Sequence, residues 1–296
     1  MRLHHLTAFV AALLAAVALT SGGMTYAAAA LHSSPLERAR SGGGVTVTNK
    51  VTLPETSIAG PALTPLNTRL AWTGTDTAHH LNVATGPDGL HFPTKTTLPE
   101  TSLTNPVVTD AVSFFPGVAV AWTGTDPAHL LNVELVPGGT KLTLHESGLG
   151  APAIAQVGLN GGQVLLLVWT GIDPNHSLNV LPLTPHAGGS GSLVLVPGTK
   201  TVLPQFNSDA GPSLLGNENN ANSIFVLGWS VRGTQRLNLA ESTDGAHFTS
   251  ALGAGLPETS AAAPQFIQPA GSSSGCITWT GTDAANHLNV AQLTLP

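Results

Sequence analysis

The sequence predicts an all-β protein built from five copies of a four-stranded antiparallel unit. Three observations lead to this prediction. A pattern of about 50 residues recurs five times along the chain. Turn-forming Gly, Pro, Asp and Asn separate short apolar runs, and no stretch after residue 31 has the 3.6-residue apolar period of a capped helix. Repeated units of this length and strand number are typical of a β-propeller, so we expect a five-bladed one.

The first thirty residues have the order of a secretory signal peptide. A positive charge at Arg2 precedes an apolar run over residues 6–20, and small residues at 27–30 offer a cleavage site. The apolar run is shorter than the roughly 20 residues that cross a bilayer, although an uncleaved anchor helix is the alternative. We therefore expect residues 1–30 to be a signal peptide, residues 31–44 to be a flexible leader, and residues 45–296 to be a secreted propeller without a membrane span.

Two short motifs mark each unit. The first begins with tryptophan and reads Trp-Thr-Gly-Thr-Asp-Thr-Ala-His-His-Leu-Asn-Val in its first copy. It starts at Trp72, Trp122, Trp169 and Trp279, and in a diverged form at Trp229. The second reads Leu-Pro-Glu-Thr-Ser in its best copies and starts at Leu53, Leu98, Leu144, Leu203 and Leu256. The five copies of each motif indicate five units.

Each unit divides into four short strands. In the first unit we expect them at 62–63, 70–75, 80–84 and 92–98, where apolar and β-branched residues lie between turn residues. The last unit ends after its third strand, whereas residues 45–53 match the fourth strand of other units. We therefore expect the strand at 45–53 to complete the last blade, which closes the ring and removes two exposed sheet edges.

The composition excludes several function classes. Only 9% of the residues are charged, Lys and Arg together number 10, and the formal net charge is −6. So few cations cannot neutralise many phosphates, which argues against a nucleic-acid partner. The single cysteine, Cys276, excludes an internal disulfide framework and a multi-cysteine metal cluster. No glycine-rich phosphate loop or Gly-x-Ser-x-Gly motif occurs in the sequence. We expect neither a cofactor nor a metal.

The candidate binding residues lie in two loops of each unit. In a propeller blade, the turn between strands two and three shares one rim with the link from strand four to the next blade. Here the first loop is a turn that contains aspartate, and the second is the Glu-Thr-Ser link. The predicted ligand-binding residues are Asp76, His79, His80, Asp126, His129, Asp173, His176, Asp283, His287, Glu55, Glu100 and Glu258. We assign no catalytic residue.

Each of these residue types also has a structural interpretation. The aspartates can accept hydrogen bonds from amides of their own turns, which is the commoner role. The tryptophans are expected in the core rather than as sugar-stacking platforms. The asparagines of the repeated Leu-Asn-Val segment are expected to be buried and bonded to backbone groups. The turn histidines are too few in each turn to form a metal site by themselves.

The fourth unit departs from the pattern. It has Arg232-Gly-Thr-Gln-Arg236 in place of the aspartate turn, and Gln205 in place of the link glutamate. Either this unit has drifted, or it holds a single special site.

Two segments resemble a motif of a known propeller family. Residues 84–92 and 240–248 share the core Asp-Gly-x-His-Phe and resemble a shortened Asp-box of sialidase-like propellers, in which the box is a structural turn. Sialidases use an arginine triad and a tyrosine nucleophile. Here the only tyrosine is Tyr26, and the repeat region holds three arginines, at 69, 232 and 236. The resemblance therefore implies the fold without a competent sialidase site.

The repeat region is also similar to five-bladed lectins of the tachylectin type and to secreted bacterial proteins with Trp-Thr-Gly-Thr-Asp repeats. Four near-copies of one rim offer several equivalent weak sites, and linked weak sites gain avidity. The first hypothesis is therefore multivalent, lectin-like recognition of glycans. The alternatives are a protein-interaction propeller of the cell envelope and a glycoside hydrolase with a central-channel carboxylate, for which the candidates are Asp110, Glu134, Asp209 and Glu241.

Overall fold

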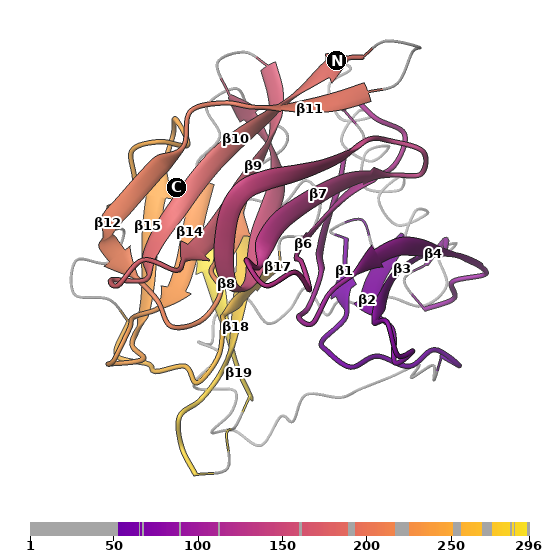
Figure 1. Cartoon of the computed structure of the whole chain (residues 1–296). Coiled ribbons are helices and arrows are strands. Elements are labelled where there is room, and N and C mark those ends of the chain that lie inside the picture. The colour runs from indigo at the N-terminus through magenta and orange to yellow at the C-terminus, as the bar shows by residue number, and fades with distance from the viewer. Residues whose placement is uncertain are drawn as a thin grey trace, which may run out of the picture. The chain divides into compact units, whose positions relative to one another are not determined.

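The structure is a computed structural model, and it describes residues 53–64, 66, 68–88, 90–111, 113–159, 162–188, 193–216, 225–250, 256–267, 274–284, 286 and 288–294. The predicted signal peptide, the leader and nearly all of the strand predicted at 45–53 lie outside these residues. The described residues form nineteen strands and no helix (Figure 1), which confirms the all-β class. The strands belong to one compact body, residues 47–296.

The strands group into units in the predicted order. Unit 1 consists of β1 (Ala62–Leu63), β2 (Arg69–Thr73), β3 (His80–Thr85) and β4 (Thr94–Thr101). Unit 2 consists of β5 (Val107–Asp110), β6 (Val118–Thr123), β7 (Leu130–Val136) and the first part of β8 (Lys141–Leu159). Unit 3 consists of the rest of β8, β9 (Gly162–Gly171), β10 (Ser177–Ala187), β11 (Leu193–Pro197) and β12 (Thr201–Asn207). Unit 4 consists of β13 (Ser213–Leu215), β14 (Phe225–Ser230), β15 (Leu237–Ser242) and β16 (Thr249–Ser250), and unit 5 of β17 (Gln265–Ile267), β18 (Ser274–Thr280) and β19 (Leu288–Thr294).

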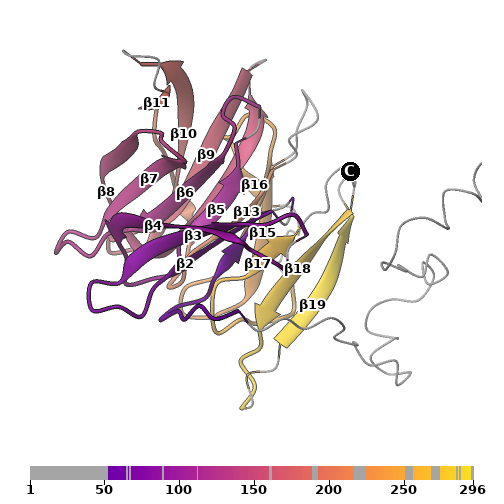
Figure 2. The same ribbon diagram turned by 90° about the vertical axis from the view of Figure 1, so that its right-hand side faces the viewer.

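Within a unit, consecutive strands pair antiparallel, except in unit 3, where β11 and β12 both pair with β10. Unit 1 has the order β1-β2-β3-β4, and unit 5 has the order β17-β18-β19 with β19 at the edge (Figure 2). The fourth strand of unit 1 starts two residues later than predicted and continues to Thr101. Pro93 has no N–H to donate to the ladder, and a register shift between His80 and Asn82 lets the strand run on past Pro99.

Strand β8 departs from the prediction of separate strands in units 2 and 3. Its first residues pair with β7, and from Gly148 onward it pairs with β9, so units 2 and 3 form one eight-stranded sheet. The change of pairing partner from β7 to β9 takes place at Gly148 and Gly150. Gly150 has a φ of 69°, which residues other than glycine rarely adopt. The corresponding link between units 1 and 2 has Ser102 and Thr104 at these positions, and there the two strands remain separate.

The core is divided among the junctions between consecutive units. Four clusters of buried apolar side chains occur in the described residues, one at each junction from unit 1 to unit 5. Representative pairs across the junctions are Val83 with Trp122, Leu131 with Leu167, Val180 with Leu227, and Leu239 with Ile277. The first strands of neighbouring units are also in contact, in the series β1, β5, β8, β13 and β17. Each unit therefore buries its sheet faces against its sequence neighbours.

The five tryptophans are buried, with between 1% and 8% of their surface exposed. This confirms that they belong to the core. In units 1 and 2 a lysine covers the ring, since Nζ of Lys95 lies 5.3 Å from the ring centre of Trp72 and Nζ of Lys141 lies 5.6 Å from that of Trp122.

The asparagines of the first three units are also buried as predicted. The amide of Asn82 donates to the carbonyl of His80 at 3.0 Å and accepts a hydrogen bond from Thr97 at 2.7 Å. In unit 2, Asn132 makes the same two contacts with Leu130 and Thr143. These amides fix the point at which the aspartate turn enters the third strand.

Candidate functional site

The aspartates close their own turns. Oδ1 of Asp76 accepts hydrogen bonds from the amide of Ala78 at 3.1 Å and from Nδ1 of His80 at 2.7 Å, and Oδ2 accepts one from the amide of His80 at 3.2 Å. Asp126 and Asp173 bond to the equivalent amides of their turns. Burial alone would raise the pKa of Asp173, but the hydrogen bonds from Ser177 and Asn175 hold it below its ordinary value. These three aspartates therefore make the turn hydrogen bonds that the structural interpretation expects, and ligand binding by them stays a prediction.

A left-handed residue follows each turn. The positive φ angles are 60° at His79, 51° at His129, 52° at His176, 57° at Gln235 and 51° at Asn286. Histidine and asparagine are among the residues that tolerate this conformation best. In the last unit the position belongs to Asn286, so His287 stands in register with His80 and not with the other turn histidines. Residue 287 itself lies outside the described residues.

The turn and the link lie side by side, as predicted from the propeller pattern. The amide of Ser102 donates to the carbonyl of His79 at 3.1 Å, and the amide of Gly148 donates to that of His129 at 3.2 Å. Equivalent bonds join Ser208 to His176 and Ser260 to Gln235. Each link also reaches the next unit, because the hydroxyl of Ser102 donates to the carbonyl of Thr123 at 3.1 Å.

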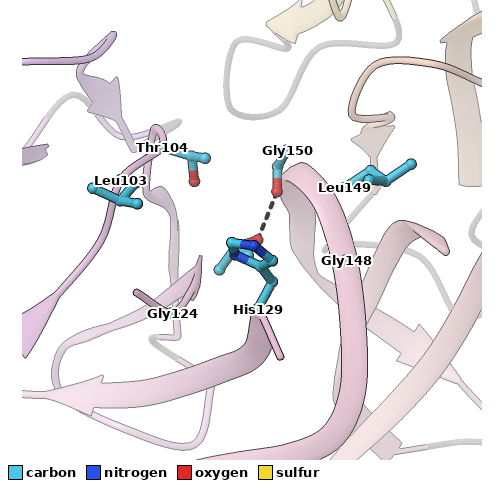
Figure 3. A pocket seen from close by; sticks show the side chains of 8 residues that line it. Leu103, Thr104, Gly124, His129, Gly148, Leu149 and Gly150 are labelled. Atoms are coloured by element: carbon cyan, nitrogen blue, oxygen red, sulfur yellow. Dashed lines mark hydrogen bonds between the residues drawn. The ribbon is translucent and has the colours of Figure 1, made fainter. Parts of the chain in front are cut away.

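A cavity of about 230 Å³ lies between two links at unit 2 (Figure 3). The ring of His129 stands between Leu103 and Thr104 on one side and Leu149 and Gly150 on the other. The remaining residues that line the cavity are Thr123, Gly124 and Gly148. The hydroxyl of Thr123 donates to the carbonyl of Gly150 at 2.6 Å. The cavity offers apolar walls, a histidine and a threonine hydroxyl.

Sequence reasoning found His129 but missed the link residues of this cavity. The signal was an aliphatic residue after the serine position of an otherwise polar link, namely Ile58, Leu103 and Leu149. Ile58 and Leu103 are 42% and 54% exposed. A second signal was the presence of Gly148 and Gly150 at the positions that correspond to Ser102 and Thr104 in the preceding link.

The equivalent place at unit 3 is occupied by charged groups. Nδ1 of His176 lies 2.7 Å from Oδ1 of Asp209, and Nε of Arg232 lies 3.3 Å from the same oxygen. Arg232 also donates to the carbonyl of Pro174. Asp209 takes the position of Leu149 in the repeat. At unit 3 an ion pair with Arg232 of the diverged fourth unit therefore stands where the cavity at unit 2 has an apolar side chain.

The link glutamates point toward lysines of the following unit. Glu55 pairs with Lys95 at 2.6 Å, Glu100 pairs with Lys141, and Glu146 pairs with Lys200 at 2.7 Å. The structure therefore brings Glu55 and Glu100 into ion pairs with lysines of fourth strands, not into the cavity at His129. Glu258 is exposed, and its carbonyl accepts a hydrogen bond from the amide of Leu237 at 2.9 Å. Asp283 is exposed on its turn.

The carboxylates suggested for a hydrolase lie on different strands and, for Asp209, in a link. Asp110 on β5 is only 2% exposed; burial raises its pKa, and its Oδ2 accepts a hydrogen bond from the amide of Leu66 in unit 1. Glu134 on β7 also has a raised pKa, chiefly through burial and then through the charge of Glu100. Asp209 is the ion-paired residue described above, and Glu241 lies on β15. Among the described residues, no cluster of three His, Cys, Asp or Glu side chains could hold a metal ion.

The segments that resemble an Asp-box form structural turns. Asp88 accepts hydrogen bonds from the amides of Leu90 and His91, both at 2.9 Å, and lies 2.8 Å from Nδ1 of His91. Asp244 and His247 repeat this arrangement. These turns follow the third strand, whereas the aspartate turns precede it, so the two sets lie at opposite ends of that strand.

Comparison with known proteins does not extend these observations: no protein-family model matches the chain, and no curated protein matches it. In the part of the chain that the structure describes, no helix has the length and apolar character needed to cross a membrane.

Proposed function

We propose that the protein is a secreted, non-catalytic, five-bladed β-propeller that binds glycans at cavities between its links. The unit pattern, the four inter-unit clusters and the series of contacting first strands support the propeller, with the last blade completed by the strand at 45–53. The resemblance to tachylectin-type lectins supports the ligand class. The predicted signal peptide supports secretion.

The observation that carries the proposal is the cavity at His129. Carbohydrate sites combine an apolar surface for the sugar face with a few fixed polar groups for its hydroxyls. Leu103 and Leu149 supply the first, and Thr104 and His129 supply the second. The turn that holds His129 is braced by Asp126 and by the following link, so the histidine is presented by a fixed backbone.

The glycosidase alternative has less support. Acid–base catalysis needs two carboxyl groups on either side of one bond, about 5 to 9 Å apart. Asp110 is fully buried and already bonded to unit 1, and Glu134 lies on the third strand of its unit. The link glutamates are paired with lysines.

The test is a glycan array on the mature protein, together with a release assay on chromogenic glycosides. Binding without release is expected, and any glycan found is then titrated by calorimetry. Leu149→Asp, which copies the residue at position 209, should weaken binding at least tenfold. Asp88→Asn, at the other end of the sheet, should leave it unchanged. Turnover of a glycoside would favour the hydrolase, whereas a blank array with capture of a cell-surface protein would favour the interaction propeller.

A further inference from the structure

Residues 53–60 dock on unit 1 as each link docks on the unit that follows it. The hydroxyls of Thr56 and Thr75 lie 2.6 Å apart, as those of Thr101 and Thr125 do at 2.9 Å. Ser57 forms a bridge with Gly74, as Ser102 does with Gly124. The hydroxyl of Ser57 donates to the carbonyl of Thr73 at 2.9 Å. Residues 53–60 therefore occupy the position of a link that comes from a preceding unit.

Where the structure describes the residues that lead into such a link, they form the fourth strand of the preceding unit. This holds for β4, the first part of β8, and β12. The residues before Leu53 are thus expected to be a fourth strand as well. Among the described strands, unit 5 has three, and its β19 pairs with β18 alone.

The third strand of unit 5, β19, is more exposed to solvent at Val290 than the third strands of units 1 to 4 are at the equivalent residue. Val290 is 58% exposed. The equivalent residues of the first four units are no more than 5% exposed; they are Val83, Val133, Val180 and Leu239. A half-exposed valine in the middle of a strand marks a face and an edge that lack their neighbours.

A ladder of ion pairs identifies the neighbour. In each of the three pairs, the glutamate stands two residues after the motif leucine of one unit. Its lysine partner stands three residues before the motif leucine of the next unit. The pairs are Glu55 with Lys95, Glu100 with Lys141, and Glu146 with Lys200. At the next junction both partners are absent from the sequence, which has Gln205 and Gly253 at these positions.

One glutamate and one lysine of the pattern then remain. Glu258 stands two residues after Leu256, and Lys50 stands three residues before Leu53. In a ring of five units these two residues belong to the same junction, between units 4 and 5. The joint loss at the junction between units 3 and 4 shows why this match is informative: the glutamate and the lysine are kept or lost together.

We infer, resting on the proposed ring of five units, that residues 45–52 form the fourth strand of unit 5, antiparallel to β19, with Lys50 opposite Ala291 and ion-paired with Glu258. The register follows from Ala84 opposite Lys95 and from Glu134 opposite Lys141. The occupant is this chain's own segment, because residues 45–52 lead without a spacer into residues 53–60, which the same chain holds on unit 1.

The first test is a disulfide across the inferred pair. In a Cys276→Ser background, Lys50→Cys with Ala291→Cys should form an intramolecular disulfide on mild oxidation, since directly opposed strand residues lie within bridging distance. The matched control is Ala84→Cys with Lys95→Cys, which are opposed in unit 1. Peptide mapping under non-reducing conditions should find both links in the monomer. A link in the control alone, or a link between two chains, overturns the inference.

The second test reverses charges and leaves the strands intact. Glu258→Lys and Lys50→Glu should each lower the melting temperature by roughly 1–3 °C at low salt, and the double variant should restore it. Glu100→Lys with Lys141→Glu is the matched set at a described pair. A double variant no more stable than either single variant contradicts the inference. Neither test uses a ligand, so a blank glycan array and a failed closure are separate results.

Discussion

The hydroxyl of Thr143 donates a 2.8 Å hydrogen bond to the side-chain carbonyl of Asn132, although the two residues lie on different strands. The amide of Asn132 is only 5% exposed and donates in turn to the carbonyl of Leu130. We predict that Asn132→Ala lowers the free energy of unfolding by about 1–3 kcal/mol, because it leaves buried partners without hydrogen bonds. Urea denaturation measures this. Thr140→Ala, in an exposed turn, is the control and should change little; equal losses at both sites would contradict the prediction.

The left-handed backbone at His129 predicts an unusual order of stabilities. With φ at 51°, alanine is strained there and glycine is not, so His129→Gly should be more stable than His129→Ala by about 1 kcal/mol. At His145, on the extended strand β8, the order should reverse. Thermal denaturation of the four variants tests this, and both histidine variants at 129 should also lose glycan binding. The same order at both positions would show that backbone strain is not the cause.

The Asp88 turn predicts a loss of stability in acid. The hydrogen bond with the His91 side chain, and then those from the amides of Leu90 and His91, lower the pKa of Asp88 to about 2. An unfolded aspartate titrates near 3.9. The stabilisation is therefore fully present above about pH 4 and is lost as the pH falls through the folded pKa near 2. The melting-temperature difference between the wild type and Asp88→Asn should be present at pH 5 and should vanish near pH 2. An equal difference at pH 2.5 and pH 6 would refute this assignment.

For Glu134 we expect the opposite effect of pH on stability from that at Asp88, because its pKa is raised. Its Oε2 is buried without a hydrogen-bond partner among the described residues, and burial raises its pKa. The carboxylate is therefore disfavoured by folding: the cost is absent below the unfolded pKa near 4.3 and appears as the pH rises through the folded value. Glu134→Gln should stabilise the protein by about 1 kcal/mol at pH 7 and have little effect at pH 4. Glu146→Gln, which breaks the pair with Lys200, should not stabilise it at either pH; a gain there would contradict this explanation.

The repeat made much of the fold predictable. The five tryptophans and the interleaved leucine motif located the units. The expected burial is confirmed for the five tryptophans and for Asn82, Asn132 and Asn179, because each recurs at a position that the sheet pairing repeats. Asn238 and Asn289 are only half-buried. The strand-sharing at β8 was not predictable from the motif, because Gly148 and Gly150 read equally well as a turn. Only the pairing shows that the backbone continues there.

The candidate site was only partly accessible to sequence reasoning. Asp76, Asp126 and Asp173 share a turn with the histidines, but their oxygens are used by their own amides. The lysine partners of Glu55 and Glu100 lie about 40 residues further along the sequence, on the next fourth strand. Local motifs do not reveal contacts across so large a sequence separation. Leu103 and Leu149 read as ordinary apolar residues until the pairing placed them beside His129.

One continuous strand, β8, serves as the outer edge of one unit and the innermost strand of the next. If either unit melts, the other loses the anchor of a strand it depends on. Units 2 and 3 should therefore open together, and the amide hydrogens on both sides of Gly148 should exchange with solvent as a single cooperative block.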